Sequence, residues 1–314
     1  MNRITRGAAL AVVTVVAAAA MAFAPTAASG LPHGADGGWG EAAAVSGVNA
    51  PQADGCPIES PNGQELYIAS MRGGPDNDIW VAGRVDKPGS FDAPLQLPAP
   101  INSAAQDFCP TPLADGSLLF VSTRGGVDAY GTAACGGGDI YIVHRVPGTA
   151  DWTEPRNLGC APNGPNTAGW EYGPSLVTTG STTYLYFSSG ANFQQPGSLE
   201  DDQDIYASPQ IGALAFGPGE PVAELNTEMH DMMPNVSRDG MEIVFASNRA
   251  GGAGLFDIYT AHRAGSAKGT SGGWRAPTIV AAVSTAGAET RPSLSGDGHR
   301  LYFGRDGDIF VSTR

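Results

Sequence analysis

The chain has 314 residues, a formal net charge of −14 at pH 7, 44 glycines and 24 prolines. This acidic balance argues against nucleic acid and anionic membrane as partners, because phosphate groups attract basic proteins. The glycine and proline content, without a long stretch of helical periodicity, excludes a helical bundle and predicts an all-β fold.

The first residues are typical of an export signal. Arg3 and Arg6 precede an Ala/Val-rich run from Ala8 to Ala24 that is followed by small residues. We expect a signal peptide at residues 1–28, a flexible linker at 29–38 and a folded domain at 39–314. A retained membrane anchor is the alternative, although the run is short and weakly apolar. Export predicts a secreted or periplasmic protein.

The rest of the chain contains one sequence unit five times. Each unit has an acid three residues before a proline, and five residues after that proline begins a turn with glycine in second place. A strand-like run follows, then a variable glycine-rich loop, then a run that opens with aspartate, as in DIY. The aligned prolines are Pro57, Pro110, Pro174, Pro234 and Pro292, and the aspartates that open the later runs are Asp78, Asp139, Asp204, Asp257 and Asp308.

A period of this length with four strand-like pieces per unit is typical of a propeller blade. The fourth piece begins with an aromatic residue, as at Phe91 and Trp152, but the last unit ends without one. Trp39, near the N-terminus, begins such a piece without a unit ahead of it. We therefore predict a five-bladed β-propeller that the N-terminal strand closes by pairing in the last blade.

The motifs SRDGMEIVF and SGDGHRLYF, the Ser-x-Arg triplets at Arg72, Arg124 and Arg249, and the DI[YWF] runs resemble the WD40-like, TolB-type repeat often called PD40. The resemblance covers nearly the whole folded domain. It implies a propeller, and its functions range from partner-binding periplasmic proteins to propeller domains attached to peptidases. The third unit departs most, since Thr179-Gly180 replaces Asp-Gly and Gly190 replaces the arginine.

The four cysteines of an exported chain favour disulfides over metal or catalysis. Three connectivities are possible, and in a four-stranded blade all four cysteines fall on one face. We prefer Cys56–Cys109, which would join equivalent positions in neighbouring blades, and Cys135–Cys160, which would be a local bridge.

The repeated acids predict a ring of carboxylates at the mouth of the central channel. They are Asp54, Asp107, Glu171, Asp231 and Glu289. A Ca²⁺ site is one interpretation, because oxygen ligands suit that ion. The preferred one is structural: each acid anchors its own blade, for instance by pairing with Arg72, Arg124, Arg249 or Arg305. We also interpret each of these arginines as the partner, across its hairpin, of the aspartate that opens the next strand.

Residues that break the repeat near the acids are the candidate ligand site, because a binding site requires asymmetry. They are Phe108, Trp170, Tyr172, His230, Met232, Met233 and Arg291. Together they predict a shallow pocket of aromatic, thioether and cationic groups. Ordinary filling of a tapering channel is the other interpretation. The long loops Gly125–Gly138 and Gly190–Gln203 should project over the same face, and the acids at 200–202 in the second loop are a further possible Ca²⁺ site.

The sequence contains no serine-hydrolase elbow, zinc-protease motif or phosphate-binding loop. We therefore predict a secreted, monomeric binding or scaffolding module, with no cofactor, that recognises a protein or glycan on the disulfide-bearing face. The alternative is a carbohydrate-active hydrolase or lyase that uses carboxylates at the channel mouth, as some five-bladed propellers do.

Overall fold

The computed structural model describes residues 38–85, 90–192, 202–266 and 269–314. The expected signal peptide at 1–28, and the expected linker up to residue 37, lie outside these ranges. Every regular element of the described ranges is a β-strand, and none of them contains a helix long and apolar enough to span a membrane.

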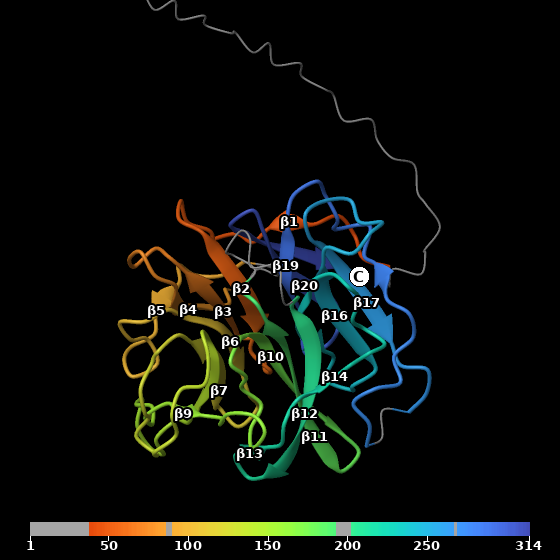
Figure 1. Ribbon diagram of the computed structural model, residues 1–314. Helices are drawn as coiled ribbons and strands as arrows, with labels where there is room; N and C mark the ends of the chain where they lie inside the picture. The colour runs from red at the N-terminus through yellow and green to blue at the C-terminus, as the bar shows by residue number, and fades with distance from the viewer. Residues whose placement is uncertain (1–37, 86–89, 193–201, 267–268) are drawn as a thin grey trace, which may run out of the picture. The chain divides into compact units, whose positions relative to one another are not determined.

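The strands form five antiparallel sheets, each of which is one blade (Figure 1). Blade one contains β2 (Asp54–Glu59), β3 (Glu65–Ser70), β4 (Asp78–Gly83) and β5 (Leu95–Gln96). Blade two contains β6 (Asp107–Pro112), β7 (Leu118–Ser122), β8 (Asp139–Val143) and β9 (Arg156–Asn157). Blade three contains β10 (Trp170–Thr179), β11 (Thr182–Gly190), β12 (Asp204–Gly212), β13 (Ala215–Phe216) and β14 (Glu220–Pro221). Blade four contains β15 (Asp231–Val236), β16 (Glu242–Ser247), β17 (Asp257–His262) and β18 (Thr278–Ile279). Blade five contains β19 (Glu289–Leu294), β20 (Arg300–Arg305), β21 (Asp308–Thr313) and, from the other end of the chain, β1 (Ala43–Ala44).

The innermost strands contact one another in cyclic order. β2 contacts β6, β6 contacts β10, β10 contacts β15, β15 contacts β19, and β19 contacts β2 again. The predicted five-bladed propeller is therefore confirmed. In four blades the innermost strand begins at the repeat acid itself, and in all five the third strand begins at the repeat aspartate.

The ring closes as the sequence predicts. β1 pairs antiparallel with β21, with Ala43 opposite Val311, and Figure 1 shows the orange β1 beside the blue strands of the last blade. The Asn49 side chain then accepts a hydrogen bond from the Ile309 N–H at 2.7 Å and donates one to the Ile309 carbonyl at 3.1 Å. Asn102 makes the same pair of bonds to Ile79 between blades one and two. The closing joint thus uses the same contact as an ordinary joint.

An arginine stacked on an aromatic ring holds the outer edge of most blades. The guanidinium of Arg314 lies 4.3 Å from the Trp39 ring centroid, and Arg145 lies 3.7 Å from that of Trp152. The same pairs recur as Arg84 with Phe91 and Arg263 with Trp274. Since the paired part of the fourth strand is short, the buried ring and its cation–π contact anchor this piece.

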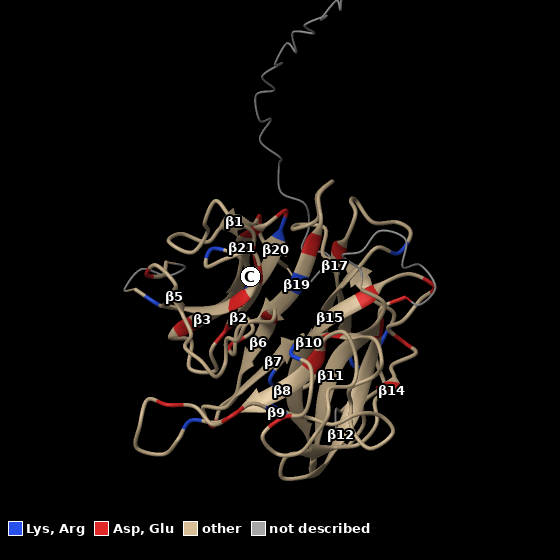
Figure 2. Ribbon diagram, turned by 60° about the vertical axis from the view of Figure 1, so that its left-hand side comes forward, with Lys and Arg blue, Asp and Glu red and all other residues tan. Residues whose placement is uncertain are grey.

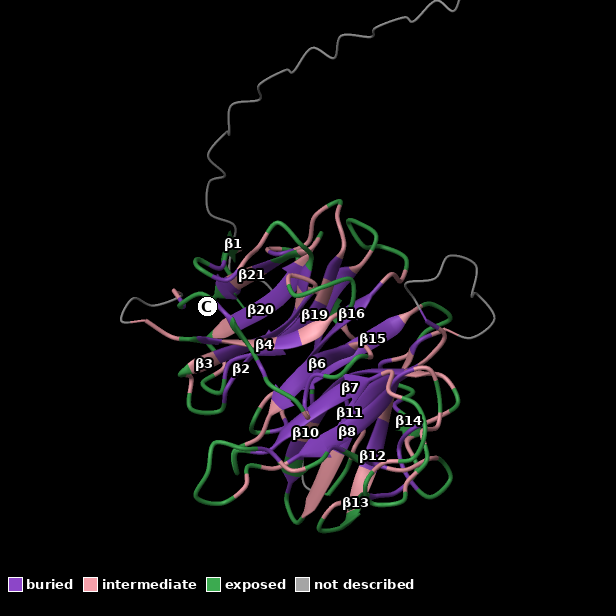
Figure 3. Cartoon of the chain, turned by 90° about the vertical axis from the view of Figure 1, so that its left-hand side faces the viewer, coloured by how far each residue is buried: buried purple, intermediate pink, exposed green. Residues whose placement is uncertain are grey.

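The apolar core lies between neighbouring blades. One cluster joins Ile58 and Tyr67 of blade one to Phe120 of blade two, and another joins Ile68 of blade one to Tyr302 of blade five. Figure 3 shows the inner strands as mostly buried, whereas the outer strands and most loops are partly or fully exposed. Adjacent blades are thus stabilised by burial of the surface that they share.

We expect Trp39→Ala to lower the free energy of unfolding by about 3–5 kcal/mol, because a buried indole and its contact with Arg314 are lost. Hydrogen exchange should also become faster along β21, since β1 would no longer be anchored. Trp152→Ala is the matched control: it should destabilise blade two and leave the protection of β21 unchanged. Unchanged exchange in β21 of Trp39→Ala would contradict this account of ring closure.

Candidate functional site

A β-bulge interrupts each innermost strand at the repeat proline. The residue before that proline has a positive φ in every blade: Cys56 48°, Cys109 47°, Gly173 60°, Met233 55° and Arg291 48°. Such a conformation is unfavourable for residues other than glycine, so the surrounding structure must impose it. The bulge brings these five residues together around the axis of the propeller.

Two of the five are cysteines, and they form a disulfide between blades one and two. Cys56 is bonded to Cys109 with a Cα separation of 4.9 Å, and Cys135 to Cys160 with 5.4 Å. Both preferred pairings are therefore confirmed. The described residues contain no free cysteine.

Arg291 fills the axis below this disulfide. Its side chain, only 1% exposed, donates hydrogen bonds to the carbonyls of Pro234 and Pro110, each at 3.4 Å, and to Thr111 Oγ1 at 3.1 Å. A Cβ at Gly173 would lie 2.6 Å from the Met233 Cα and 3.0 Å from Arg291 Nη1, so only glycine fits there. Burial lowers the pKa of Arg291 to about 9, which leaves it positively charged at neutral pH.

A pocket of about 220 Å³ opens above Arg291 on the disulfide-bearing face. Phe108 and Tyr172 form its aromatic wall, with ring centroids 5.6 Å apart. Met71 and Asn77 belong to its half-exposed rim. We call this the axial pocket; its full lining is Ala53, Asp54, Gly55, Cys56, Ala69, Met71, Asn77, Phe108, Cys109, Tyr172, Met233, Thr290 and Arg291.

The axial pocket thus contains Phe108, Tyr172, Met233 and Arg291 of the predicted ligand residues. Trp170 lies next to it, stacked on Tyr172 with centroids 6.2 Å apart. Met232 is fully buried in the hydrophobic core instead. The ring of His230 lies 6.1 Å from that of Phe256, and its Nδ1 accepts a hydrogen bond from the Gln203 N–H.

The five repeat acids are all buried, and of these only Asp54 contributes to the wall of the axial pocket. Each accepts a hydrogen bond from the backbone N–H of the residue four positions before it: Ala50, Ser103, Thr167, Thr227 and Thr285. Each acid therefore holds the turn through which the chain enters its blade. Among the described residues, no group of three or more His, Cys, Asp or Glu side chains is arranged to hold a metal ion.

Four of the acids also pair with an arginine. Arg72 contacts Asp54 at 2.6 Å, Arg124 contacts Asp107 at 2.6 Å, Arg249 contacts Asp231, and Arg305 contacts Glu289 at 2.8 Å. In three blades the arginine Nε also donates to a serine hydroxyl two residues earlier. The suggested pairing of the acids with these arginines is correct.

The further interpretation, in which these arginines also pair across the hairpin with the next strand's aspartate, is wrong, since the ion pairs of the described residues join them to the repeat acids. Asp139 accepts hydrogen bonds from the N–H groups of Cys135 and Gly136, and Asp257 from those of Ala253 and Gly254. The loop before each of these aspartates thus supplies its hydrogen bonds, although Asp257 Oδ1 has no partner among the described residues. In the three blades that have it, the serine two residues before the arginine directs the guanidinium toward the acid of the innermost strand instead.

Blade three has the acid but not the arginine. Glu171 pairs in register with Ser189, as Asp54 pairs with Ser70 in blade one. Arg72 lies two residues after Ser70, so the equivalent residue of blade three is Ala191, and the assignment of Gly190 to this place was wrong by one residue.

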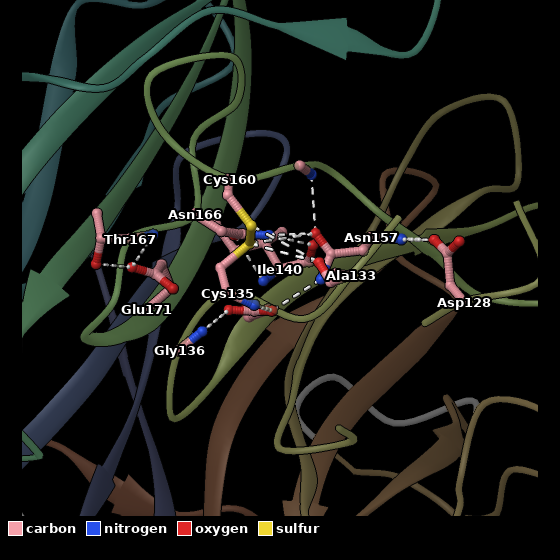
Figure 4. The surroundings of a disulfide bond; sticks show 12 residues. Asp128, Ala133, Cys135, Gly136, Ile140, Asn157, Cys160, Asn166, Thr167 and Glu171 are labelled. Carbon is pink, nitrogen blue, oxygen red and sulfur yellow. Dashed lines mark hydrogen bonds between the residues drawn. A yellow bond between two sulfur atoms is a disulfide. The ribbon is translucent and has the colours of Figure 1, made fainter. Parts of the chain in front are cut away.

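The Glu171 carboxyl group has an unequal environment at its two oxygens. Oε1 accepts hydrogen bonds from the Thr167 N–H, the Thr167 hydroxyl and the Ser189 hydroxyl. Oε2 is buried and has no hydrogen-bond partner among the described residues. Burial raises the pKa of Glu171 to about 8, against the opposing effect of these hydrogen bonds. Figure 4 shows Glu171 bonded to Thr167, with the Cys135–Cys160 disulfide in the same view.

The Gly125–Gly138 loop is fully described, and its last residues lie against blade three: the Gly137 N–H donates to the Gly169 carbonyl. Of the Gly190–Gln203 loop, residues 193–201 lie outside the described ranges, and with them two of the three acids at 200–202.

No protein-family model and no curated protein matches the chain. Solved structures do match. One is a candidate TolB from Agrobacterium tumefaciens, 18% identical, covering 81% of this chain and 70% of that one with a TM-score of 0.44. Another is a protein of unknown function from Dyadobacter fermentans, 15% identical, covering 87% and 98% with a TM-score of 0.49.

A third match is an α-L-arabinofuranosidase from Podospora anserina, 11% identical, which covers 88% of this chain and 96% of that one with a TM-score of 0.52. At these identities the likeness concerns the fold alone. The chain is a β-propeller with a TolB-like structural neighbour, and its membership of the PD40 family stays a prediction.

Asp231→Asn should lower the free energy of unfolding by about 3–5 kcal/mol at pH 7, because it leaves the largely buried Arg249 without its counter-charge. Glu171→Gln should cost far less, since no arginine faces Glu171 and a protonated carboxyl group resembles an amide. Urea unfolding of both variants measures the difference. Equal losses of unfolding free energy in the two variants would contradict the assignment of the paired acids as structural anchors of their blades.

The raised pKa of Glu171 also predicts a pH dependence of stability. The folded state holds this proton more tightly than the unfolded chain, whose glutamate has a pKa of about 4.5. The stabilisation is complete below that value and is lost as the pH rises through about 8. One pKa unit corresponds to about 1.4 kcal/mol, so wild type should lose several kcal/mol relative to Glu171→Gln between pH 5 and pH 9. Parallel urea titrations test this, and a constant difference would refute it.

Proposed function

We propose that this protein is an exported, monomeric binding module that takes part of a protein or glycan ligand into the axial pocket. The observation that carries the proposal is the pocket itself, which is aromatic on its wall, polar at its rim and closed at its floor by Arg291. Two disulfides fit an extracellular or periplasmic protein, because such bonds persist in oxidising compartments.

The pocket's size and lining restrict what can enter it. Its volume of about 220 Å³ is below the usual range for whole drug-sized ligands. It suits one sugar ring or one side chain of a larger partner. The Phe108 and Tyr172 rings favour an apolar face, and the Asn77 amide and the Arg291 cation at the floor favour a group that accepts hydrogen bonds.

The charge of the protein supports this choice of partners. Acidic positions, red in Figure 2, outnumber basic ones over the propeller. Nucleic acid and anionic membrane would therefore be repelled. The proposed module needs no cofactor.

A hydrolase is the second candidate, and the raised pKa of Glu171 is the observation that favours it. A carboxyl group that stays protonated at neutral pH can act as a general acid. Glycoside hydrolysis usually requires a second, ionised carboxylate across the scissile bond. The other four ring acids are paired with arginines, so binding without turnover is the better-supported function.

To test this function, a large side chain is placed at the rim of the axial pocket so that it blocks the entrance. Met71→Trp would place an indole at the entrance, and Met241→Trp, at the opposite end of the propeller, is the matched control. Arabino-oligosaccharides, chosen because one solved propeller of like fold is an arabinofuranosidase, and immobilised peptides serve as probes.

We expect any probe that binds wild type to bind Met71→Trp at least about tenfold more weakly and Met241→Trp equally well. Equal binding by Met71→Trp would contradict the axial site. Release of reducing sugar that Glu171→Gln abolishes would support the hydrolase instead.

A further inference from the structure

We propose that blade three is a receptor for a guanidinium group supplied from outside the chain. The other four blades each hold an arginine of their own against the repeat acid. In three of them it lies two residues after the serine, and in blade five Arg305 itself stands in register with Glu289. Blade three retains most of the groups that surround that arginine, but it has Ala191 at the arginine's position. The inference concerns a site beside the axial pocket and does not depend on the proposed function.

The four arginines share one environment. Besides its acid, each contacts a backbone carbonyl six residues before that acid: Val48, Ile101, Leu225 or Val283. Each guanidinium also lies over one or two aromatic rings. Arg124 is 5.2 Å from the Phe120 centroid and 5.3 Å from that of Tyr141, and Arg249 is 5.1 Å from Phe245 and 4.9 Å from Tyr259.

Blade three has the same pair of rings. Phe187 and Tyr206 stand at the corresponding positions of β11 and β12, with centroids 5.9 Å apart and planes inclined by 20°. The equivalent pair in blade four, Phe245 and Tyr259, has 6.0 Å and 25°. The ring geometry that supports a guanidinium elsewhere is therefore retained without an arginine.

The acid is retained too, and its free oxygen is the one that an arginine would contact. In blade four one Asp231 oxygen holds the turn through Thr227, and the other contacts Arg249. In blade three Glu171 Oε1 holds the turn through Thr167, and buried Oε2 has no partner among the described residues. Ser189, which corresponds to the serine that accepts the arginine Nε–H elsewhere, donates to Oε1 instead.

A pocket of about 520 Å³ opens beside these groups, which we call the blade-three pocket. Thr167, Ser189 and Ala191 line it together with Tyr206. Its wall also carries Asp202 and Asp204, and burial together with the nearby acids Asp231 and Asp202 raises the pKa of Asp204 to about 6. Glu171 is fully buried and is not one of the lining residues, so an external guanidinium would reach Oε2 by displacing the side chains that line this pocket.

The chain has no basic side chain of its own nearby in sequence. Between Arg156 and Arg238 it contains no lysine or arginine. A buried carboxylate without a counter-charge is unfavourable, and a bound cation would restore the pairing that the other acids have. A guanidinium fits better than an ammonium, because it is planar, stacks on aromatic rings and can donate to one carboxylate oxygen and a backbone carbonyl at once, as it does in the other blades.

The test uses N-acetyl-arginine amide as the probe and isothermal titration calorimetry as the measurement. We expect wild type to bind it with a dissociation constant of about 1 mM or tighter. N-acetyl-lysine amide should bind at least about tenfold more weakly. Glu171→Gln should lose arginine binding, and Asp115→Asn, in an exposed turn at the other end of blade two, is the matched control that should keep it.

A second variant tests the site without a ligand. Ala191→Arg should supply the missing arginine, raise the thermal midpoint by a few degrees and abolish probe binding. Ala191→Gln should do neither. No binding to wild type, equal binding of both probes, or an unchanged midpoint for Ala191→Arg would each overturn the proposal.

The source of the guanidinium is distinguished by comparing agmatine with a blocked Gly-Arg-Gly peptide. Tighter binding of the peptide indicates an arginine on a partner chain, and tighter binding of agmatine indicates a small free compound. Either result supports a guanidinium site.

Discussion

A buried carboxylate at the beginning of each innermost strand is the interaction on which the rest of the structure depends. One of its oxygens accepts the N–H of the turn that leads into the blade, and in four blades the other contacts an arginine. A carboxylate without water is stable only when its oxygens are bonded. The acid therefore fixes the entry turn, the innermost strand and the loop after the second strand relative to one another.

This set of contacts around the buried acid explains why the blades repeat so closely in sequence while the loops between them vary. The groups that must meet are the acid, the arginine and the rings below it, joined in three blades by the serine, and all belong to the strands or their immediate ends. Loop residues beyond these positions are free to differ. Blade three changes one member of the set, and the consequence stays local: Glu171 keeps its turn, but its pKa rises to about 8 because burial is no longer compensated by a cation.

Much of the fold could be predicted from the sequence, because its determinants recur at fixed spacing. The acid marks the first residue of β2, β6, β15 and β19, and the aspartate of DI[YWF] marks the first residue of every third strand. Ring closure was predictable because the fifth unit lacks the fourth, aromatic-led strand, whereas an unassigned strand of that kind begins at Trp39. The one-face placement of the cysteines left three connectivities open, and the preference for equivalent neighbours and a local bridge selected the two pairs that form.

The sites were less predictable, because they depend on register and on contacts across the axis. The arginine of Ser-x-Arg lies near two carboxylates in sequence, and only the pairing of Asp54 with Ser70 shows which of them it reaches. Similarly, Met232 and Met233 look interchangeable in the sequence. The bulge inserts one residue and so reverses the alternation of side chains. Both methionines belong to the same buried cluster, but only Met233 also lines the pocket.

At the propeller axis, a pocket can form only because the five bulge residues differ from blade to blade. Five strands converge there with the same bulge, and five identical large side chains would not fit. The chain uses a cystine in two blades, no side chain at Gly173, a thioether at Met233 and one long cation at Arg291. Because Gly173 is empty beyond its Cα, Arg291 can extend across the axis to the carbonyls of blades two and four. That single asymmetric side chain sets the depth of the axial pocket and places positive charge at its floor. The repeated residues support the blades, and the residues that break the repeat shape the axial pocket.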